Sequence, residues 1–224
     1  MLPETLPRLT ISDAAARRFA RLTRDVRACG VCPAMAHCHA LGPANGPLDA
    51  RLLVVAEAVG RRGGAVTGVP LTRDVSAARF AAFLTIAGID RRDVFVTNAV
   101  LCNPLDARGR NRPPTRGDCA RCRPFLVRTL DIVRAPHVVA CGRVALEALR
   151  AISAHDADLP RDAATPVAWC GRTLVPMYHP GRQSTLHRPQ DRQEEDWRRL
   201  GDLARGADAP YGDDRPGGGR RGAR

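Results

Sequence analysis

Short apolar runs alternate with amphipathic segments along most of this chain. Three continuous apolar runs predict strands that are buried on both faces, at residues 52–56, 94–98 and 137–142. Patterns of helical period predict helices over residues 12–27, 75–87, 118–133, 143–152 and 189–203. Residues 167–170 and 173–177 flank Gly171-Arg172, which indicates a short hairpin or two strand pieces.

This alternation of strand and helix predicts an α/β fold. We expect a three-layer sandwich in which a central, mainly parallel sheet of four to five strands carries helices on both sides. The remaining segments 29–47, 60–68 and 103–114 are rich in Gly, Pro or polar residues and are interpreted as loops. A single domain is predicted over residues 1–204. Residues 205–224, rich in Gly, Arg, Asp and Pro, are predicted to form a disordered tail.

Composition narrows the class of protein. No apolar run approaches the ~20 residues that a membrane span needs, and the N-terminus has no signal-peptide pattern. We therefore expect a cytoplasmic protein without membrane contact, and a monomer. The formal net charge is +12 and every basic residue is Arg. A basic body favours a polyanionic partner such as nucleic acid over a protein that is merely soluble and basic.

Polar side chains follow the predicted strands. Glu57 comes after the first strand, Asn98 ends the second and His179 follows the last. Because ligands bind beyond the carboxyl ends of parallel strands, these residues are expected to share one site. A carboxylate can activate water, and a histidine can donate to a leaving group. Asp74 is a second candidate carboxylate, although it also fits the N-cap of the next helix.

Eight cysteines in a cytosolic chain point away from disulfides and towards metal, catalysis or burial. Two C-x2-C pairs, Cys29/Cys32 and Cys119/Cys122, usually indicate zinc. Cys102 lies between them, as a ligand of a four-thiolate iron–sulfur cluster could. A weaker zinc alternative uses Cys29, Cys32 and Cys38 with His37 or His39. Three cysteines are expected to pack as small hydrophobes, namely Cys38, Cys141 and Cys170.

Taken together, these motifs resemble the iron–sulfur uracil-DNA glycosylases over residues 29–199. The stretch Ala56-Glu57-Ala58-Val59-Gly60 is similar to the Gly-Glu-Ala-Pro-Gly motif of family four. Residues 67–76, Thr-Gly-Val-Pro-Leu-Thr-Arg-Asp-Val-Ser, align without gaps to a family-five stretch in which Phe stands in place of Leu71. Cys122-Arg-Pro-Phe-Leu matches the family's stretch at the last cluster ligand, so the resemblance favours Cys122 over Cys119.

The resemblance implies hydrolysis of the N-glycosidic bond of uracil in DNA, with other deaminated bases as further candidate substrates. The implied catalytic residues are Glu57, Asp74 and His179. The implied base-binding residues are Ala56, Ala58, Gly60, Leu71 and Asn98. Arg182, His187 and Arg188 would contact DNA, and Cys29, Cys32, Cys102 and Cys122 would hold one [4Fe-4S] cluster. Leu71 offers an apolar contact but no aromatic face to an extruded base.

Two other functions compete with this interpretation. The first is a non-catalytic nucleic-acid-binding protein with a structural metal site, and the second is a zinc hydrolase that uses Cys and His ligands. The chain has no Lys to form the Schiff base that a strand-cleaving lyase commonly uses. We therefore expect an abasic product without strand scission.

Overall fold

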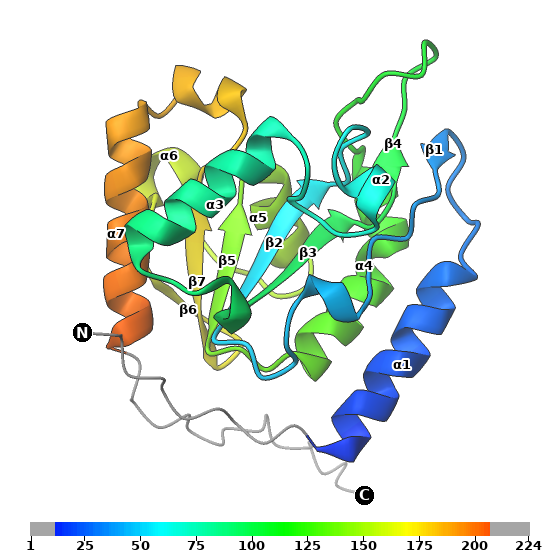
Figure 1. The fold of residues 1–224 in the computed structure, drawn as a ribbon, viewed down its shortest axis with the longest axis horizontal. Coiled ribbons are helices and arrows are strands. Elements are labelled where there is room, and N and C mark those ends of the chain that lie inside the picture. The colour runs from blue at the N-terminus through cyan, green and yellow to red at the C-terminus, as the bar shows by residue number, and fades with distance from the viewer. Residues whose placement is uncertain (1–11, 207–224) are drawn as a thin grey trace, which may run out of the picture.

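A central five-stranded sheet organises the chain (Figure 1), whose computed structural model describes residues 12–206. Its strands are β2 (Leu52–Ala58), β3 (Val94–Val100), β5 (His137–Cys141), β6 (Val167–Trp169) and β7 (Arg172–Met177). They lie in the order β3-β2-β5-β7-β6. β3, β2, β5 and β7 pair in parallel, whereas β6 is antiparallel to β7. The predicted sheet is confirmed. Of the predicted tail 205–224, Arg205 still belongs to the last helix, and residues 207–224 lie outside the described residues.

Successive side chains of a strand point to opposite faces of the sheet. In β2, Leu52 and Val54 pack on the face covered by α3 (Val75–Ala87) and α7 (Gln190–Arg205). The rings of Phe83 and Trp197 stack between these two helices, with centroids 5.5 Å apart. This aromatic contact joins elements that are more than 100 residues apart in sequence.

The opposite face of the sheet is covered by α1 (Asp13–Arg27), α4 (Arg116–Ile132) and α5 (Arg143–Arg150). Leu53 and Val55 of β2 belong to this second core. Phe19 of α1 meets Phe95 of β3 edge-on, with a centroid distance of 5.8 Å. Two cores on the two faces of one sheet make the predicted three-layer sandwich. Each predicted helix begins and ends within two residues of the observed one.

The β6–β7 hairpin corrects one expectation about the cysteines. Trp169 pairs with Arg172, so Cys170 and Gly171 form the tip of a two-residue turn. Both have left-handed backbones, with φ of 49° and 66°. Cys170 is therefore exposed rather than packed as a small hydrophobe, because a two-residue hairpin turn projects its central residues into solvent.

Short elements that the sequence analysis did not predict occupy several connecting segments. They comprise α2 (Gly64–Thr67), α6 (Leu159–Asp162), β1 (Met35–Ala36), β4 (Asn103–Pro104) and the 3-10 turns Pro43–Asn45, Arg91–Asp93 and Arg182–Leu186. β1 and β4 form a two-stranded antiparallel sheet. Their pairing carries the segment around Cys29 and Cys32 to the end of β3. In the part of the chain that the structure describes, no helix is both long and apolar enough to cross a membrane.

Candidate active site and cysteine cavity

A cavity of about 530 Å³ opens at the carboxyl ends of the parallel strands. It is large enough for one small planar ligand. Eight of the predicted site residues line it: Glu57, Ala58, Gly60, Leu71, Asp74, Asn98, His179 and Arg182. The three catalytic candidates therefore share one space, although they are 17 to 122 positions apart in sequence.

Three predicted site residues do not line this cavity. Ala56 is 1% exposed and belongs to the core beneath α3. His187 follows the 3-10 turn that carries Arg182. Arg188 forms a bidentate ion pair with Asp196 of α7, with N–O distances of 2.9 and 2.5 Å. Since Asp196 is 1% exposed, the guanidinium of Arg188 neutralises a buried charge, and the structure gives it an intramolecular role.

Glu57 lies near the end of β2, where the strand leaves the core. Burial raises the pKa of its carboxyl group above the usual range, and the charge of Arg143 partly opposes this shift. A carboxylate with a raised pKa is a stronger base than a solvated one. Its environment therefore suits a group that accepts a proton from water near neutral pH.

Each carboxylate oxygen of Asp74 has a different neighbour. Oδ1 accepts a hydrogen bond of 2.9 Å from the backbone N–H of Ala77 and so caps α3. Oδ2 lies against the loop at residues 60–63, where a Cβ on Gly63 would come within 2.4 Å of it. The helix-cap interpretation is thus correct, and the same carboxylate also lines the cavity.

His179 has a defined tautomer in the neutral state. The backbone N–H of Gly181 donates to Nδ1 at 2.9 Å, so the proton of the neutral ring is on Nε2. Burial lowers the pKa of the imidazole, while the charge of Asp74 acts in the opposite direction. At neutral pH the ring is therefore uncharged and has one N–H free to donate.

The loop that carries His179 is held from two sides. Nε of Arg79, in α3, donates to the carbonyl of Pro180 at 2.9 Å. Behind the ring, a Cβ on Gly142 would lie 3.3 Å from Cβ of His179, so a glycine allows the close approach. Sequence reasoning missed both positions, because an Arg in a helix and a Gly after a strand have no distinctive pattern.

Asn98 presents an unpaired donor in this cavity. The residue is 2% exposed, and its Nδ2 has no hydrogen-bond partner among the described residues. A buried amide without a partner costs roughly 1–3 kcal/mol. An acceptor on a bound ligand would remove that cost.

Further residues of the cavity wall come from the segment after β3 and from the loop around His179. The additional polar lining residues are Ser76, Asn103, Asn111, Arg112, Gln183 and Ser184. Asn103 donates from Nδ2 to the carbonyl of Val59 at 2.6 Å and to Oδ1 of Asn111 at 3.1 Å. These bonds connect the segment after β3 to the end of β2. The sequence interpretation missed these residues because residues 103–114 resemble an ordinary polar loop.

Leu71 lines the cavity from a strained loop. Its φ is 51° and that of Arg73 is 67°, both in the left-handed region that non-glycine residues rarely adopt. Such conformations cost of order 1–3 kcal/mol each and tend to occur at functional sites. The side chain of Leu71 also packs against the α3/α7 core, which fixes its place in the wall.

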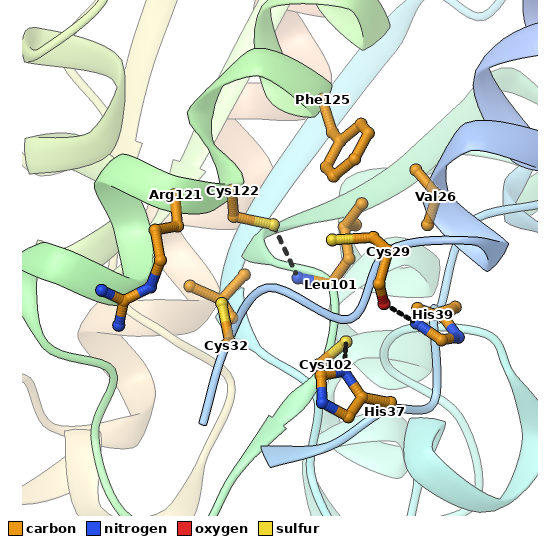
Figure 2. Close-up of a pocket in the computed structure, with 11 residues that line it drawn as sticks. Val26, Cys29, Cys32, His37, His39, Leu101, Cys102, Arg121, Cys122 and Phe125 are labelled. Carbon is orange, nitrogen blue, oxygen red and sulfur yellow. Dashed lines mark hydrogen bonds between the residues drawn. The ribbon is translucent and has the colours of Figure 1, made fainter. Parts of the chain in front are cut away.

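A second cavity lies at the end of β3, on the side of α1 and α4 (Figure 2). The four cysteines that the family resemblance implies all line it: Cys29, Cys32, Cys102 and Cys122. Cys119, one turn earlier in α4, does not line it. The backbone N–H of Leu101 donates to Sγ of Cys122 at 3.4 Å. The structure thus gathers four thiols from three distant segments around one hollow.

The thiols in this second cavity differ in their environments. Burial raises the pKa of Cys122 to about 12. A hydrogen bond with Cys38 is the main cause that lowers the pKa of Cys102 to about 5, against the opposing effect of burial. Cys38 is therefore a half-buried partner of Cys102 and does not pack as a small hydrophobe, whereas Cys141 is fully buried as expected.

Comparison with known proteins identifies the family of this chain. A model of the uracil DNA glycosylase superfamily matches residues 43–202. The chain belongs to the uracil-DNA glycosylase superfamily. The matched range contains every residue of the larger cavity, whereas Cys29 and Cys32 precede it. The residues of the sheet-edge cavity thus lie within the matched part of the chain, and the cysteine cavity extends beyond it.

Curated relatives in the superfamily are of two types. The chain is 28% identical to the type-4 uracil-DNA glycosylase of Thermotoga maritima over 71% of this chain and 79% of the relative. It is 28% identical to the type-4 uracil-DNA glycosylase of Archaeoglobus fulgidus over 81% and 91%, respectively. A type-5 uracil-DNA glycosylase of Pyrobaculum aerophilum is 32% identical over 62% of this chain and 64% of the relative. The expected mixture of the two types is consistent with these similarities.

Proposed function

We propose that this protein is a DNA-repair glycosylase that hydrolyses the bond between uracil and deoxyribose and leaves an abasic site. The observation that carries the proposal is the composition of one cavity. It contains two carboxylates, a neutral imidazole with a free Nε2–H and a buried amide with an unpaired Nδ2. Each group matches one requirement of breaking a glycosidic bond to a heterocycle.

The chemical roles follow from charge development in the reaction. As the bond between C1′ and the base breaks, its electron pair moves onto the base and positive charge develops on the sugar. Glu57 accepts a proton from water, whose oxygen bonds to C1′, and Asp74 adds negative charge close to the sugar. Nε2–H of His179 donates to an oxygen of the departing base, and Nδ2 of Asn98 donates to another. The proton that Glu57 accepted then passes to the base anion, so the base leaves in its neutral form and Glu57 returns to the carboxylate.

The cysteine cavity supports a second part of the proposal, one [4Fe-4S] cluster held by Cys29, Cys32, Cys102 and Cys122. Four thiols around one hollow are the donor set that such clusters require, and the N–H of Leu101 directed at Cys122 Sγ is a typical neighbour of a cluster thiolate. Such a cluster would supply a structural cross-link. It would tie the segment after α1 to the end of β3 and to α4.

DNA containing uracil is the proposed partner, and Arg182 is the proposed contact beside the extruded base. Arg182 lines the cavity mouth and has no ion pair among the described residues. A guanidinium there can bind a phosphate next to the flipped nucleotide. The net charge of +12 favours the same polyanion. We expect the protein to act as a monomer.

A single-turnover assay on an oligonucleotide with one uracil tests the activity. Purified protein should release uracil and leave an intact strand that breaks only after alkali or heat. A panel of mismatches and of other deaminated bases would rank the substrates. Binding of the same DNA without release of any base would support the non-catalytic alternative instead.

Asp74→Asn separates the two roles of that residue. The amide retains an oxygen that can cap α3, so folding should be preserved while the charge is lost. We expect turnover to fall by about 10²–10³-fold, as for other single electrostatic groups in active sites. Full activity of this variant would leave Asp74 with the helix cap alone.

A further inference from the structure

The cysteine cavity contains more metal-binding groups than a four-thiolate cluster needs. His37 and His39 line it beside the four cysteines. The ligand atoms of His37, His39 and Cys102 all lie within 4.8 Å of one another. Figure 2 shows the ring of His37 next to the sulfur of Cys102, with His39 to the right of both.

One hydrogen bond fixes the tautomer of the neutral His39 ring. Its Nε2 lies 2.8 Å from the carbonyl oxygen of Cys29. Because a carbonyl can only accept, Nε2 carries the proton and Nδ1 has the lone pair. A histidine that donates one N–H to a backbone carbonyl and turns the other nitrogen to a metal is the usual arrangement at zinc sites.

His37 and Cys102 supply the other two groups. Nδ1 of His37 is 3.9 Å from Sγ of Cys102, a separation close to that of two ligands on one tetrahedral ion. The rings of His37 and His39 stack with their centroids 5.7 Å apart, so both face the same side of the segment. His37 is exposed, which leaves a fourth position open to solvent.

We propose that His37, His39 and Cys102 form a site for a single zinc ion that shares Cys102 with the iron–sulfur cluster. Since both ligand sets draw on the thiolate of Cys102, zinc and the cluster compete for it. Two imidazoles and one thiolate suit zinc, whereas four thiolates suit iron and sulfide. The chain therefore carries two alternative ligand sets in one cavity. This site differs from the zinc alternative drawn from the sequence, because it uses both histidines and neither cysteine of the first C-x2-C pair.

Metal analysis of the full chain tests this site without reference to glycosylase activity. The protein is produced once in iron-replete medium and once in iron-limited medium with added zinc. Iron and zinc per chain are then measured, together with zinc X-ray absorption. We expect about four iron and no stoichiometric zinc in the first preparation. The second should contain about one zinc, with one sulfur and two imidazole ligands.

Three variants make the test selective. His37→Ala removes an exposed side chain, so the fold should be preserved, and the zinc of the second preparation should lose one imidazole ligand or fall below half occupancy. His37→Ala/His39→Ala should lower zinc further and leave the iron content of the first preparation unchanged. Cys170→Ser, at the exposed hairpin tip, is the control and should change neither metal.

Two results would overturn the proposal. Zinc coordinated by four sulfurs would show that the cluster cysteines take the ion. Zinc content and ligands that do not respond to His37→Ala would exclude that histidine from the site. Absence of glycosylase activity in every preparation would contradict the proposed function but would not affect this inference.

Discussion

Both cavities lie at the end of β3, but their walls are formed by different kinds of side chain. Asn98 of β3 lines the larger cavity, and Cys102, four residues later, lines the smaller one. The wall of the larger cavity is formed by charged and amide side chains whose positions are fixed by backbone contacts. The wall of the smaller cavity is formed by thiols and imidazoles, together with apolar residues such as Val26 and Phe125.

This difference in lining suits the two cavities to different ligands. In the larger cavity an unpaired Nδ2 of Asn98 and a donor at His179 remain available for a ligand that comes and goes. In the smaller cavity the donors come from three distant segments and would close around a ligand that stays. Since both cavities are attached to one strand, a loss of the resident group is expected to disturb the position of Asn98 and thereby catalysis.

The largest expected effect comes from the smaller cavity. Cys122→Ser should abolish the brown colour and the absorbance near 400 nm and lower solubility, because three thiolates cannot hold the cluster firmly. Cys119→Ser should do neither, since Cys119 lies outside the cavity. The measurement is iron per chain with the visible spectrum. The opposite pattern would move the fourth ligand to Cys119.

Two arginines beside the larger cavity provide the next contrast. Arg188→Ala leaves the carboxylate of Asp196 buried without its partner, which should lower the free energy of unfolding by about 3 kcal/mol or more. Arg182→Ala should leave stability nearly unchanged and instead reduce the salt dependence of DNA binding.

Denaturant unfolding and DNA titrations at two salt concentrations measure these two effects. The double variant Arg188→Ala/Asp196→Ala is the control, because removing both charges should recover part of the lost stability. If Arg188→Ala weakened DNA binding without any loss of stability, Arg188 would regain the DNA contact that the family resemblance implied.

His179→Ala should affect catalysis and leave the fold in place. Removing the donor to the departing base is expected to reduce the single-turnover rate by about 10²–10³-fold, while DNA affinity changes little because phosphate contacts supply most of it. His179→Asn retains an N–H and should recover part of the rate. An equal loss of affinity and rate in His179→Ala would mean that the ring mainly binds the substrate.

Much of this architecture could be predicted from the sequence because its signals are local. The buried strands are continuous apolar runs, and Asp74 and Ser12 precede their helices as caps. The convergence of Glu57, Asn98 and His179 follows from the rule that parallel strands end at one edge. These inferences need no knowledge of long-range packing.

The remainder depends on contacts between distant segments. Arg188 and Asp196 are only eight positions apart, but their pairing depends on how the chain turns into α7, and a basic loop looks the same with or without it. The clamp from Arg79 to Pro180 joins residues 101 positions apart. The association of His37 and His39 with Cys102 depends on β1 pairing with β4, and two-residue strands have no detectable pattern in sequence.

A smaller effect should appear in the pH dependence of the glycosylase rate. Burial raises the pKa of Glu57, so this group loses its negative charge as pH falls through a value above the usual range for glutamate. Activity should therefore decline on the acid side at a higher pH than an exposed carboxylate would give. The measurement is the single-turnover rate between pH 4 and 8 (roughly the range over which such groups titrate). Glu57→Gln should be slower and should lack this acid limb, and an unchanged limb would assign it to another group.

The smallest expected effect concerns Leu71, where the similar family-five stretch carries Phe. Leu71→Phe restores a ring at the wall of the cavity, and stacking on a planar base contributes about 0.5–1.5 kcal/mol. This corresponds to roughly 2- to 10-fold tighter binding of the extruded base. Both side chains carry a Cβ, so the left-handed φ of 51° at this position is equally strained in the two proteins.

The rate at subsaturating enzyme, compared for uracil and for other deaminated bases, measures the gain. Leu71→Ala is the control and should lose apolar contact without gaining a ring. A slower Leu71→Phe variant with unchanged thermal stability would show that the cavity is shaped around leucine and that the ring obstructs the base.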